Sequence, residues 1–362
     1  MPGEEQHNKK IGVFMFFSIV IPTYNSRKTI ERALISITHN DCIDDIEIII
    51  ADDCSTESFD DILDKFSDLH IRKIMNPMHY GAPYGGREFG CQAAQGQWVT
   101  FMDHDDEYVE YAFDTVKAYI EENDLHGYLV TDFYTYNDET QEIVEIIENY
   151  NWTHGKFYEK KFLVDNDVHY ADTRSCEDIN LSVQMMCIHT RLHQPVHYLH
   201  TFTYIWHQYP ESLSQASGIG AYFFNSFPDY IDGTLKVYLD AYLEDHDVNN
   251  LSFYVDNSYS MIFYLYFYYQ GLRYEINGCP PIPRLYYQKI YENFKRMKKY
   301  FKYNTKEFIN NSKYDEFYVK EYEKARMTAK KQVPFFECES FERFVKLLPY
   351  RSSIFYPKKG RK

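Results

Sequence analysis

Three carboxylates stand within four positions of the chain, at Asp103, Asp105 and Asp106. Like charges this close repel one another unless a cation or hydrogen-bond donors balance them. Carboxylate oxygens are the ligands that Mg²⁺ and Mn²⁺ prefer, and a metal held there can neutralise the charge that develops on a leaving phosphate. The cluster therefore predicts a metal site for phosphate chemistry, although the same spacing also occurs in solvated acidic loops.

Further polar residues follow other apolar runs. Pro22-Thr23-Tyr24-Asn25 follows a strand expected at 18–21, and Asp53 follows another at 47–51. Acidic residues just past the carboxyl ends of parallel strands lie where open α/β sheets bind ligands. The positions of these residues thus point to one binding edge.

Alternating β-rich and helical patterns predict this sheet. Short apolar runs separated by segments with helical spacing are typical of βαβ units around a mainly parallel sheet. The elements we expect are strands at 18–21, 47–51, 71–75, 98–102 and 197–207, helices at 27–38, 81–95, 156–166 and 179–189, and a hairpin within 128–150.

The order of these motifs resembles a known family. The segments that carry the resemblance are Pro22-Thr23-Tyr24-Asn25, Asp52-Asp53-Cys54-Ser55-Thr56, Gly85-Gly86-Arg87, Asp103-His104-Asp105-Asp106, His154-Gly155-Lys156-Phe157 and Cys176-Glu177-Asp178. Over residues 16 to about 215 the chain resembles the inverting family 2 glycosyltransferases. This implies their GT-A fold, a Rossmann-like, mainly parallel sheet flanked by helices.

The chain departs from the family pattern at three points. Cys54 stands where Gly is usual, Gly86-Arg87-Glu88 replaces Ala-Arg-Asn, and the motif Q-x-x-R-W is absent. The missing motif argues against a processive polysaccharide synthase.

The resemblance implies a role for each matched residue on the donor side. The nucleotide-sugar, expected to be a UDP-sugar, would contact Pro22, Thr23, Tyr24, Asn25, Asp53, Arg87 and Asp103. Thr23 and Asp53 would contact the nucleobase, and Asp103 the ribose side. Asp105, with Asp103, would hold Mn²⁺ or Mg²⁺.

Two adjacent acids are candidates for the general base. Asp178 is the first choice and Glu177 the second, because only one of two neighbouring side chains at a helix start is expected to face the cleft. Such a base must come within hydrogen-bond distance of the acceptor hydroxyl. The alternative is that both acids only balance the dipole of a helix N-terminus.

Other polar residues are less decisive. His207 could bind the metal or a phosphate. Asp106 could cap the helix that follows it or contact the donor. His154 is expected to position a loop on the acceptor side, and Trp206 could stack on an acceptor ring or simply pack.

Composition restricts the class of protein. The chain has 362 residues, a net charge of −16 and seven scattered cysteines without a C-x-x-C pair. This excludes a disulfide framework and predicts a cytoplasmic protein. The apolar run at 11–21 is too short for a membrane helix, so no transmembrane segment is expected, although a peripheral position at the membrane stays open.

Charge is divided unevenly along the chain. Residues 281–362 hold 21 Lys and Arg against 9 Asp and Glu, whereas residues 1–280 hold 17 against 45. We expect a disordered extension at 1–15, a catalytic domain at 16–215, and a helical, Tyr-rich, basic region at 216–362 that binds the acceptor or forms oligomers.

The expected function is transfer of a sugar to a cell-surface polysaccharide or glycan precursor. An alternative acceptor is a phosphate-rich polymer, either a teichoic acid or DNA with a hydroxylated base, because a basic region gives affinity for phosphates. An alternative of another class is a non-catalytic sugar-nucleotide-binding or scaffold protein.

Overall fold

The computed structural model describes residues 15–173, 176–209 and 219–247, together with residues 249–250, 253–254, 257–258 and 292. The side chains of residues 219–228 and 231 are not part of this description. The expected N-terminal extension up to residue 14 and almost all of the basic region at 281–362 lie outside the described residues.

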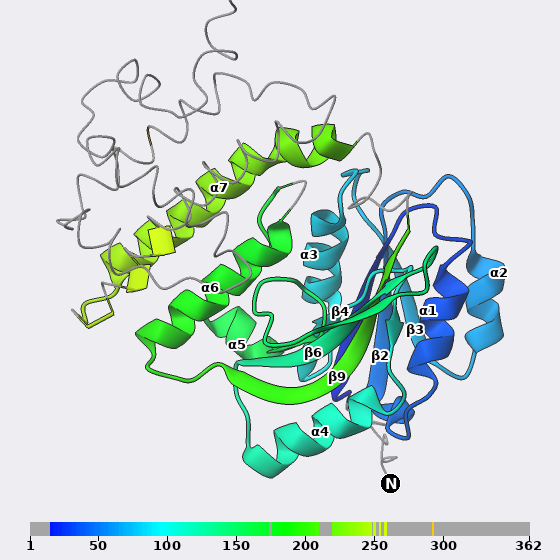
Figure 1. Ribbon diagram of the computed structural model, residues 1–362. Coiled ribbons are helices and arrows are strands. Elements are labelled where there is room, and N and C mark those ends of the chain that lie inside the picture. Colours follow the sequence, from blue (N-terminus) through cyan, green and yellow to red (C-terminus); the bar gives the residue numbers. More distant parts are fainter. Residues whose placement is uncertain are drawn as a thin grey trace, which may run out of the picture.

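Four parallel strands form the first half of the sheet, in the order β3-β2-β1-β4. They are β1 (Phe17–Thr23), β2 (Ile46–Asp52), β3 (His70–Met75) and β4 (Trp98–Phe101). Between them lie α1 (Ile30–Ile37), η1 (Ile43–Asp45), α2 (Asp60–Leu63), η2 (Asp64–Phe66) and α3 (Pro83–Ala93). Because the strands are parallel, their carboxyl ends meet at one edge (Figure 1).

The second half of the sheet is mixed. Strand β6 (Tyr128–Asn137) pairs in parallel with β9 (His197–Gln208) and antiparallel with β7 (Ile143–Ile146) and β8 (Lys156–Glu159). Strand β8 also pairs with β4 and so joins the two halves, while the short β5 (Glu107–Tyr108) pairs with β9. The helices of this half are α4 (Ala112–Asn123), α5 (Lys160–Asp165), α6 (Glu177–Arg191) and α7 (Ile219–Glu244).

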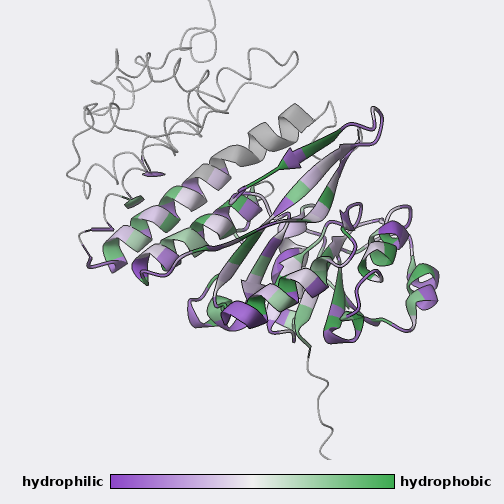
Figure 2. Ribbon diagram, turned by 60° about the horizontal axis from the view of Figure 1, so that its bottom comes forward, coloured by the Kyte–Doolittle hydropathy of each residue, from purple (hydrophilic) through white to green (hydrophobic). Residues whose placement is uncertain are grey.

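Side chains from the two faces of the sheet form two separate cores. Residues 17, 19 and 21 of β1 pack with α1 and α4, whereas Val20 packs on the other face with α5 and α6. Successive residues of a strand point to opposite faces, and helices cover both, so the central strands are apolar throughout rather than alternating. Figure 2 shows hydrophobic colours along the strands and mixed colours around the helices.

Helix α3 packs directly on β1. A Cβ atom at Gly90 would lie 2.2 Å from Cγ1 of Val20, and one at Gly86 would lie 2.9 Å from Cβ of Pro22. Both glycines are on one face of the helix because they are four residues apart. The absence of side chains at these two positions lets the first turn of α3, with Arg87, approach the end of β1 closely.

Helix α7 packs along α6 in the same direction. Asn180, near the start of α6, donates to Thr234 Oγ1 at 3.3 Å, and Arg191 at its end pairs with Glu244 at 2.9 Å. Apolar contacts between the two helices include Val183 and Tyr238. The helix that carries the two candidate bases is therefore held from outside by α7 (Figure 1).

Most of the expected elements are confirmed. The strands, the hairpin and the other helices of the N-terminal region lie within a few residues of their expected positions. The helix expected at 156–166 is wrong in its first part, because residues 156–159 form β8, whose four residues are all buried between β4 and β6. Only residues 160–165 are helical.

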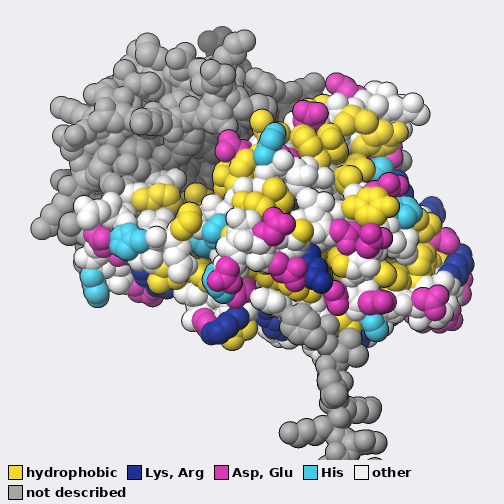
Figure 3. All heavy atoms as spheres, turned by 90° about the horizontal axis from the view of Figure 1, so that it is seen from below, with side chains coloured by type: hydrophobic (Ala, Val, Ile, Leu, Met, Phe, Trp, Pro, Cys, Tyr) yellow, Lys and Arg dark blue, Asp and Glu magenta, His cyan; other side chains and the backbone are white. Residues whose placement is uncertain are grey.

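The surface reflects the excess of acidic over basic residues in positions 1–280. On the face seen from below, acidic side chains outnumber basic ones and are interspersed with hydrophobic ones (Figure 3). No helix among the described residues is long and apolar enough to cross a membrane.

Candidate active site

Arg87 joins two of the predicted motifs. Its side chain extends from the first turns of α3, is 3% exposed, and donates from Nη2 to Oδ1 of Asp103 at 2.6 Å. Its other terminal nitrogen, Nη1, donates to Oε1 of Glu177. One buried guanidinium thus connects the end of β4 to the start of α6, and ninety positions separate Arg87 from Glu177.

This cluster controls the protonation of its members. Burial opposes the charge on Arg87, but Asp103 and Glu177 hold its pKa well above the usual value. Burial also opposes ionisation of Asp103, yet Arg87 lowers its pKa below the usual range. Glu177 is nearly inaccessible, and burial raises its pKa to about 7 even though Arg87 acts in the opposite direction.

Asp178 lies beside this ion pair in the first turn of α6. It is half-buried, and its Oδ2 accepts a hydrogen bond from the backbone N–H of Thr153 at 3.3 Å. Burial raises its pKa above the ordinary aspartate value. Because Glu177 is occupied by Arg87, Asp178 is the better placed of the two predicted bases; that either acts as a base stays a prediction.

Asp106 is a buried centre of hydrogen bonding. Its Oδ2 accepts from the hydroxyl of Tyr204 at 2.7 Å and its Oδ1 from the backbone N–H of His207 at 2.8 Å. Burial, and then repulsion from Asp105 and Asp103, raises its pKa well above the usual range. The cap that the sequence allowed is wrong, because Tyr111 is the N-cap of the following helix.

Asp105 and His207 point to different partners. Oδ2 of Asp105 accepts a hydrogen bond from the hydroxyl of Tyr209. The ring of His207 lies between Glu107, whose Oε1 is 2.8 Å from Nε2, and Asp138, whose Oδ1 is 3.1 Å from Nδ1. That His207 binds a metal or a phosphate therefore stays a prediction that requires its ring to leave these carboxylates.

The donor set suits a hard divalent cation. Arg87 uses one oxygen of Asp103, and Tyr209 uses one oxygen of Asp105, so each carboxylate keeps a second oxygen. Oxygen ligands of this kind are the ones that Mg²⁺ and Mn²⁺ prefer. The residues present therefore fit the predicted metal.

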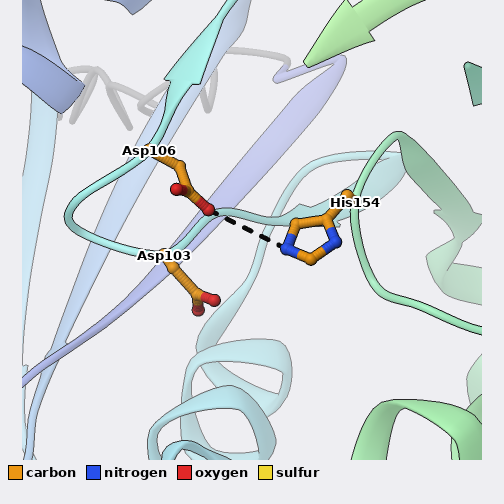
Figure 4. A group of neighbouring side chains, drawn as sticks. All are labelled: Asp103, Asp106 and His154. Carbon is orange, nitrogen blue, oxygen red and sulfur yellow. Dashed lines mark ion pairs between the residues drawn. The ribbon is translucent and has the colours of Figure 1, made fainter. Parts of the chain in front are cut away.

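A second grouping lies deeper. Within the described residues, Asp103, Asp106 and His154 bring one potential ligand atom each to within 4.8 Å of one another (Figure 4). Both oxygens of Asp106 already accept hydrogen bonds, and Nε2 of His154 is 3.9 Å from its Oδ2. Burial also lowers the pKa of His154 to about 3. We therefore regard Asp106 and His154 as structural residues on the inner side of the site. Asp103 and Asp105 are the candidate metal ligands.

The predicted nucleobase side is organised around Asp53. Its carboxylate accepts from the side chain of Asn76 at 2.9 Å and from the backbone N–H groups of Tyr80 and Gly81 at 2.9 Å each. His79 also lies 2.8 Å from Oδ2. Asp53 therefore fixes the loop between β3 and α3 beside the predicted binding edge.

Residues 22–25 lie at the end of β1, on the same side of the sheet. Pro22 packs under Gly86, and Thr23 is buried with no hydrogen-bond partner for Oγ1 among the described residues. Tyr24 is 43% exposed, with its ring centroid 4.4 Å from that of His79. Oδ1 of Asn25 accepts from the N–H of residue 56 at 2.9 Å and so holds the turn after β2. An unsatisfied hydroxyl and an exposed ring at this edge fit a ligand, and these assignments stay predictions.

Several residues that organise the site were not predicted from the sequence. Tyr204 accepts from the N–H of Asp103 at 3.1 Å while donating to Asp106. Arg32 of α1 donates to the backbone oxygen of Asp105 and pairs with Glu107 at 3.5 Å. These contacts join residues up to about a hundred positions apart, and only the pairing of β5 with β9 could have suggested the first of them.

With this geometry established, comparison with known proteins is informative. Residues 18–175 match the family model described as glycosyl transferase family 2. Over this region the chain is similar to the family 2 glycosyltransferases. The match covers the edge formed by β1, β2 and β4 and ends just before α6.

Curated relatives match parts of the chain. The GalNAc(5)-diNAcBac-PP-undecaprenol β-1,3-glucosyltransferase of Campylobacter jejuni is 32% identical over 111 residues, which are 30% of this chain and 36% of that protein. The poly(ribitol-phosphate) β-N-acetylglucosaminyltransferase TarS of Staphylococcus aureus is 28% identical over 178 residues, 45% of this chain and 31% of TarS. The chain thus spans about a third of the length of these relatives.

Solved structures confirm the fold. The crystal structure of S. aureus TarS 1–349 in complex with UDP-GlcNAc superimposes with a TM-score of 0.61 at 15% identity, covering 88% of this chain and 92% of that one. At this identity the likeness shows the fold alone, which is the GT-A fold of family 2.

One departure from the family 2 pattern has a structural cost. Cys54, where glycine is usual, has a φ angle of 63°. Glycine adopts this left-handed conformation without strain, whereas a residue with a Cβ does so only where its surroundings hold it. The loop fixed by Asp53 provides that support.

Proposed function

We propose that this chain is a metal-dependent inverting glycosyltransferase that moves a sugar from a UDP-sugar donor to a hydroxyl of a cell-surface polysaccharide or glycan precursor. One observation carries the proposal. Arg87 holds Asp103, at the predicted donor edge, and Glu177, next to the predicted base, in one buried cluster. The two halves of a transfer site are thereby brought together.

The residues of the site have different roles in the proposed reaction. Asp178 accepts the proton of the acceptor hydroxyl while the hydroxyl oxygen forms a bond to the anomeric carbon. The bond between that carbon and the diphosphate oxygen breaks, and its electron pair leaves with UDP. A divalent cation on Asp103 and Asp105 would supply charge neutralisation on the departing diphosphate. The raised pKa of Asp178 suits a group that must take up a proton.

The relatives support the donor and the class of acceptor. The TarS structure contains UDP-GlcNAc, and the C. jejuni relative is named for transfer to an undecaprenol-linked glycan. A phosphate-rich acceptor is the second candidate, because TarS is named for poly(ribitol-phosphate) and residues 281–362 of this chain are basic. Nucleic acid as acceptor, oligomer formation, and a cytoplasmic or membrane-peripheral position stay predictions.

Donor hydrolysis tests the proposal without knowledge of the acceptor. The purified protein is incubated with UDP-, GDP- and TDP-sugars in the presence of Mn²⁺ or EDTA, and nucleotide release is measured for wild type, Asp105→Ala and Asp178→Ala. A matched control is Glu122→Ala, which removes an exposed carboxylate from α4.

The outcomes separate the alternatives. We expect Mn²⁺-dependent release from one donor that is lost in Asp105→Ala and kept in Glu122→Ala. A preparation that neither binds nor hydrolyses any sugar nucleotide would instead support the non-catalytic binding or scaffold role. Transfer of labelled sugar to poly(ribitol phosphate) or to an undecaprenyl-diphosphate saccharide then distinguishes the two acceptor classes.

A further inference from the structure

Lys156 is a fully buried lysine that the proposed reaction does not use. It belongs to β8 and is 0% exposed. Its Nζ donates to the backbone oxygen of His154 at 2.8 Å and lies 5.8 Å from the centroid of the Phe133 ring. Burying an ammonium group is costly unless it is paired, so a lysine kept here needs a reason.

The loop before Lys156 reaches the predicted base. This loop, residues 147–155, connects β7 to β8, and its Thr153 N–H donates to Asp178. The ring of His154 stacks on Trp206 at 4.9 Å between centroids and faces Asp106. The loop therefore contacts both Asp178 in the first turn of α6 and Asp106 of the acidic cluster.

Neighbouring elements hold this loop at several points. Its N-terminal end is fixed by the buried carboxylate of Asp132, which accepts from the N–H of Glu148 at 3.0 Å. The hydroxyl of Tyr128 donates to the backbone oxygen of residue 150 at 3.3 Å, and Ser182 of α6 donates to that of residue 151 at 3.2 Å. Among the described residues, Lys156 is the donor that holds the oxygen of His154.

We propose that Lys156 is a positioning residue for sugar transfer: by holding the backbone of His154, it places the Thr153 N–H against Asp178 and orients that carboxylate toward the acceptor. This inference rests on the proposed function. The predicted donor contacts at residues 22–25, Asp53 and Arg87 lie on other segments. Asp103 is the predicted donor contact near His154, but it is held by Arg87, whereas Asp178 accepts directly from the loop that Lys156 holds. Lys156 therefore acts mainly on the transfer step.

The test separates donor binding from turnover. Lys156→Met keeps a stem of similar length and removes the donor group. The matched control is Lys160→Met, because Lys160 also donates to backbone oxygens, among them that of Cys91 at 3.3 Å, but does so at the C-terminal end of α3. For each variant, the Kd of UDP is measured by calorimetry. The kcat is measured for transfer of labelled sugar to poly(ribitol phosphate) and to an undecaprenyl-diphosphate saccharide.

We expect Lys156→Met to lower kcat by about 10-fold to 100-fold, the effect of misplacing a reacting group by a fraction of an ångström to an ångström. The Kd of UDP should change by less than about twofold. Lys160→Met should leave both values near those of wild type. Lys156→Arg, which restores donors at this position, should regain part of the lost kcat.

Three results would overturn the inference: an unchanged kcat in Lys156→Met, a parallel loss of kcat and UDP affinity, or equal losses in Lys156→Met and Lys160→Met. If Lys156→Met does not fold, Lys156→Gln and Lys160→Gln, which keep a polar group, are compared by the same criteria. If the wild type itself neither binds nor turns over a sugar nucleotide, the proposed function fails, and that failure is seen before any variant is made.

Discussion

Removing the guanidinium of Arg87 gives the sharpest test of how the site is held together. In Arg87→Met the buried carboxylate of Glu177 and the partly exposed carboxylate of Asp103 lose the cation that they share. Removing one member of a buried ion pair leaves an uncompensated charge and costs about 3–5 kcal/mol. We expect a loss of this size in the free energy of unfolding, measured by urea denaturation at pH 8.

The pH dependence of this loss follows from Glu177. Burial already raises its pKa to about 7, and the loss of Arg87 raises it further. A carboxyl group whose folded pKa lies above its unfolded pKa destabilises the protein at high pH, and this cost disappears as the pH falls and the group binds a proton. The cost of Arg87→Met should therefore be smaller at pH 5 than at pH 8.

A control and a second variant make the reasoning refutable. Arg27 makes a bidentate ion pair with Asp61 at the surface, with nitrogen–oxygen distances of 2.5 and 2.8 Å. Solvent screens such pairs, so Arg27→Met should cost far less. Adding Glu177→Gln to Arg87→Met should recover part of the lost stability. Equal losses in the two arginine variants, or a loss that is larger at pH 5, would refute this account of the cluster.

Further predictions concern packing, hydrogen bonding and pH. Gly90→Ala should lower the free energy of unfolding by about 1–3 kcal/mol, because the new Cβ meets Val20 at 2.2 Å; a stability equal to wild type in thermal melts would contradict that contact. Tyr204→Phe should cost about 1–3 kcal/mol, since Asp106 and the N–H of Asp103 each lose a buried partner; urea denaturation measures it. If Asp178 is the base, kcat/KM should rise with pH through a pKa above the ordinary aspartate range, and this acidic limb should vanish in Asp178→Asn.

The parallel half of the fold could be predicted because its signals are local. Buried strands that end in polar residues, separated by helical spacing, identify β1, β2 and β4 and the edge that they share. The error at residues 156–159 arose because β8 is buried on both sides by partners from distant parts of the chain. Its four residues, Lys-Phe-Tyr-Glu, are too few to show a periodicity that distinguishes a strand from the start of a helix.

The site was predictable in composition but not in arrangement. The types and order of Asp103, Asp105, Glu177 and Asp178 follow from the motifs. That Glu177 is bound to Arg87, and that His207 faces Glu107, depends on how α6 and β9 pack, which local patterns do not determine.

The close contact of Gly86 in α3 with β1 also constrains how this sequence can change in evolution. At position 86 the family commonly has alanine, yet here a methyl group would press on Pro22 and on the backbone oxygen of Ala51, 3.2 Å away. A Gly86→Ala substitution would require α3 to shift outward by a few tenths of an ångström. Arg87, the next residue, would move with it. We therefore expect positions 22 and 86 to covary among the relatives of this protein, so that an alignment could detect the contact without a structure.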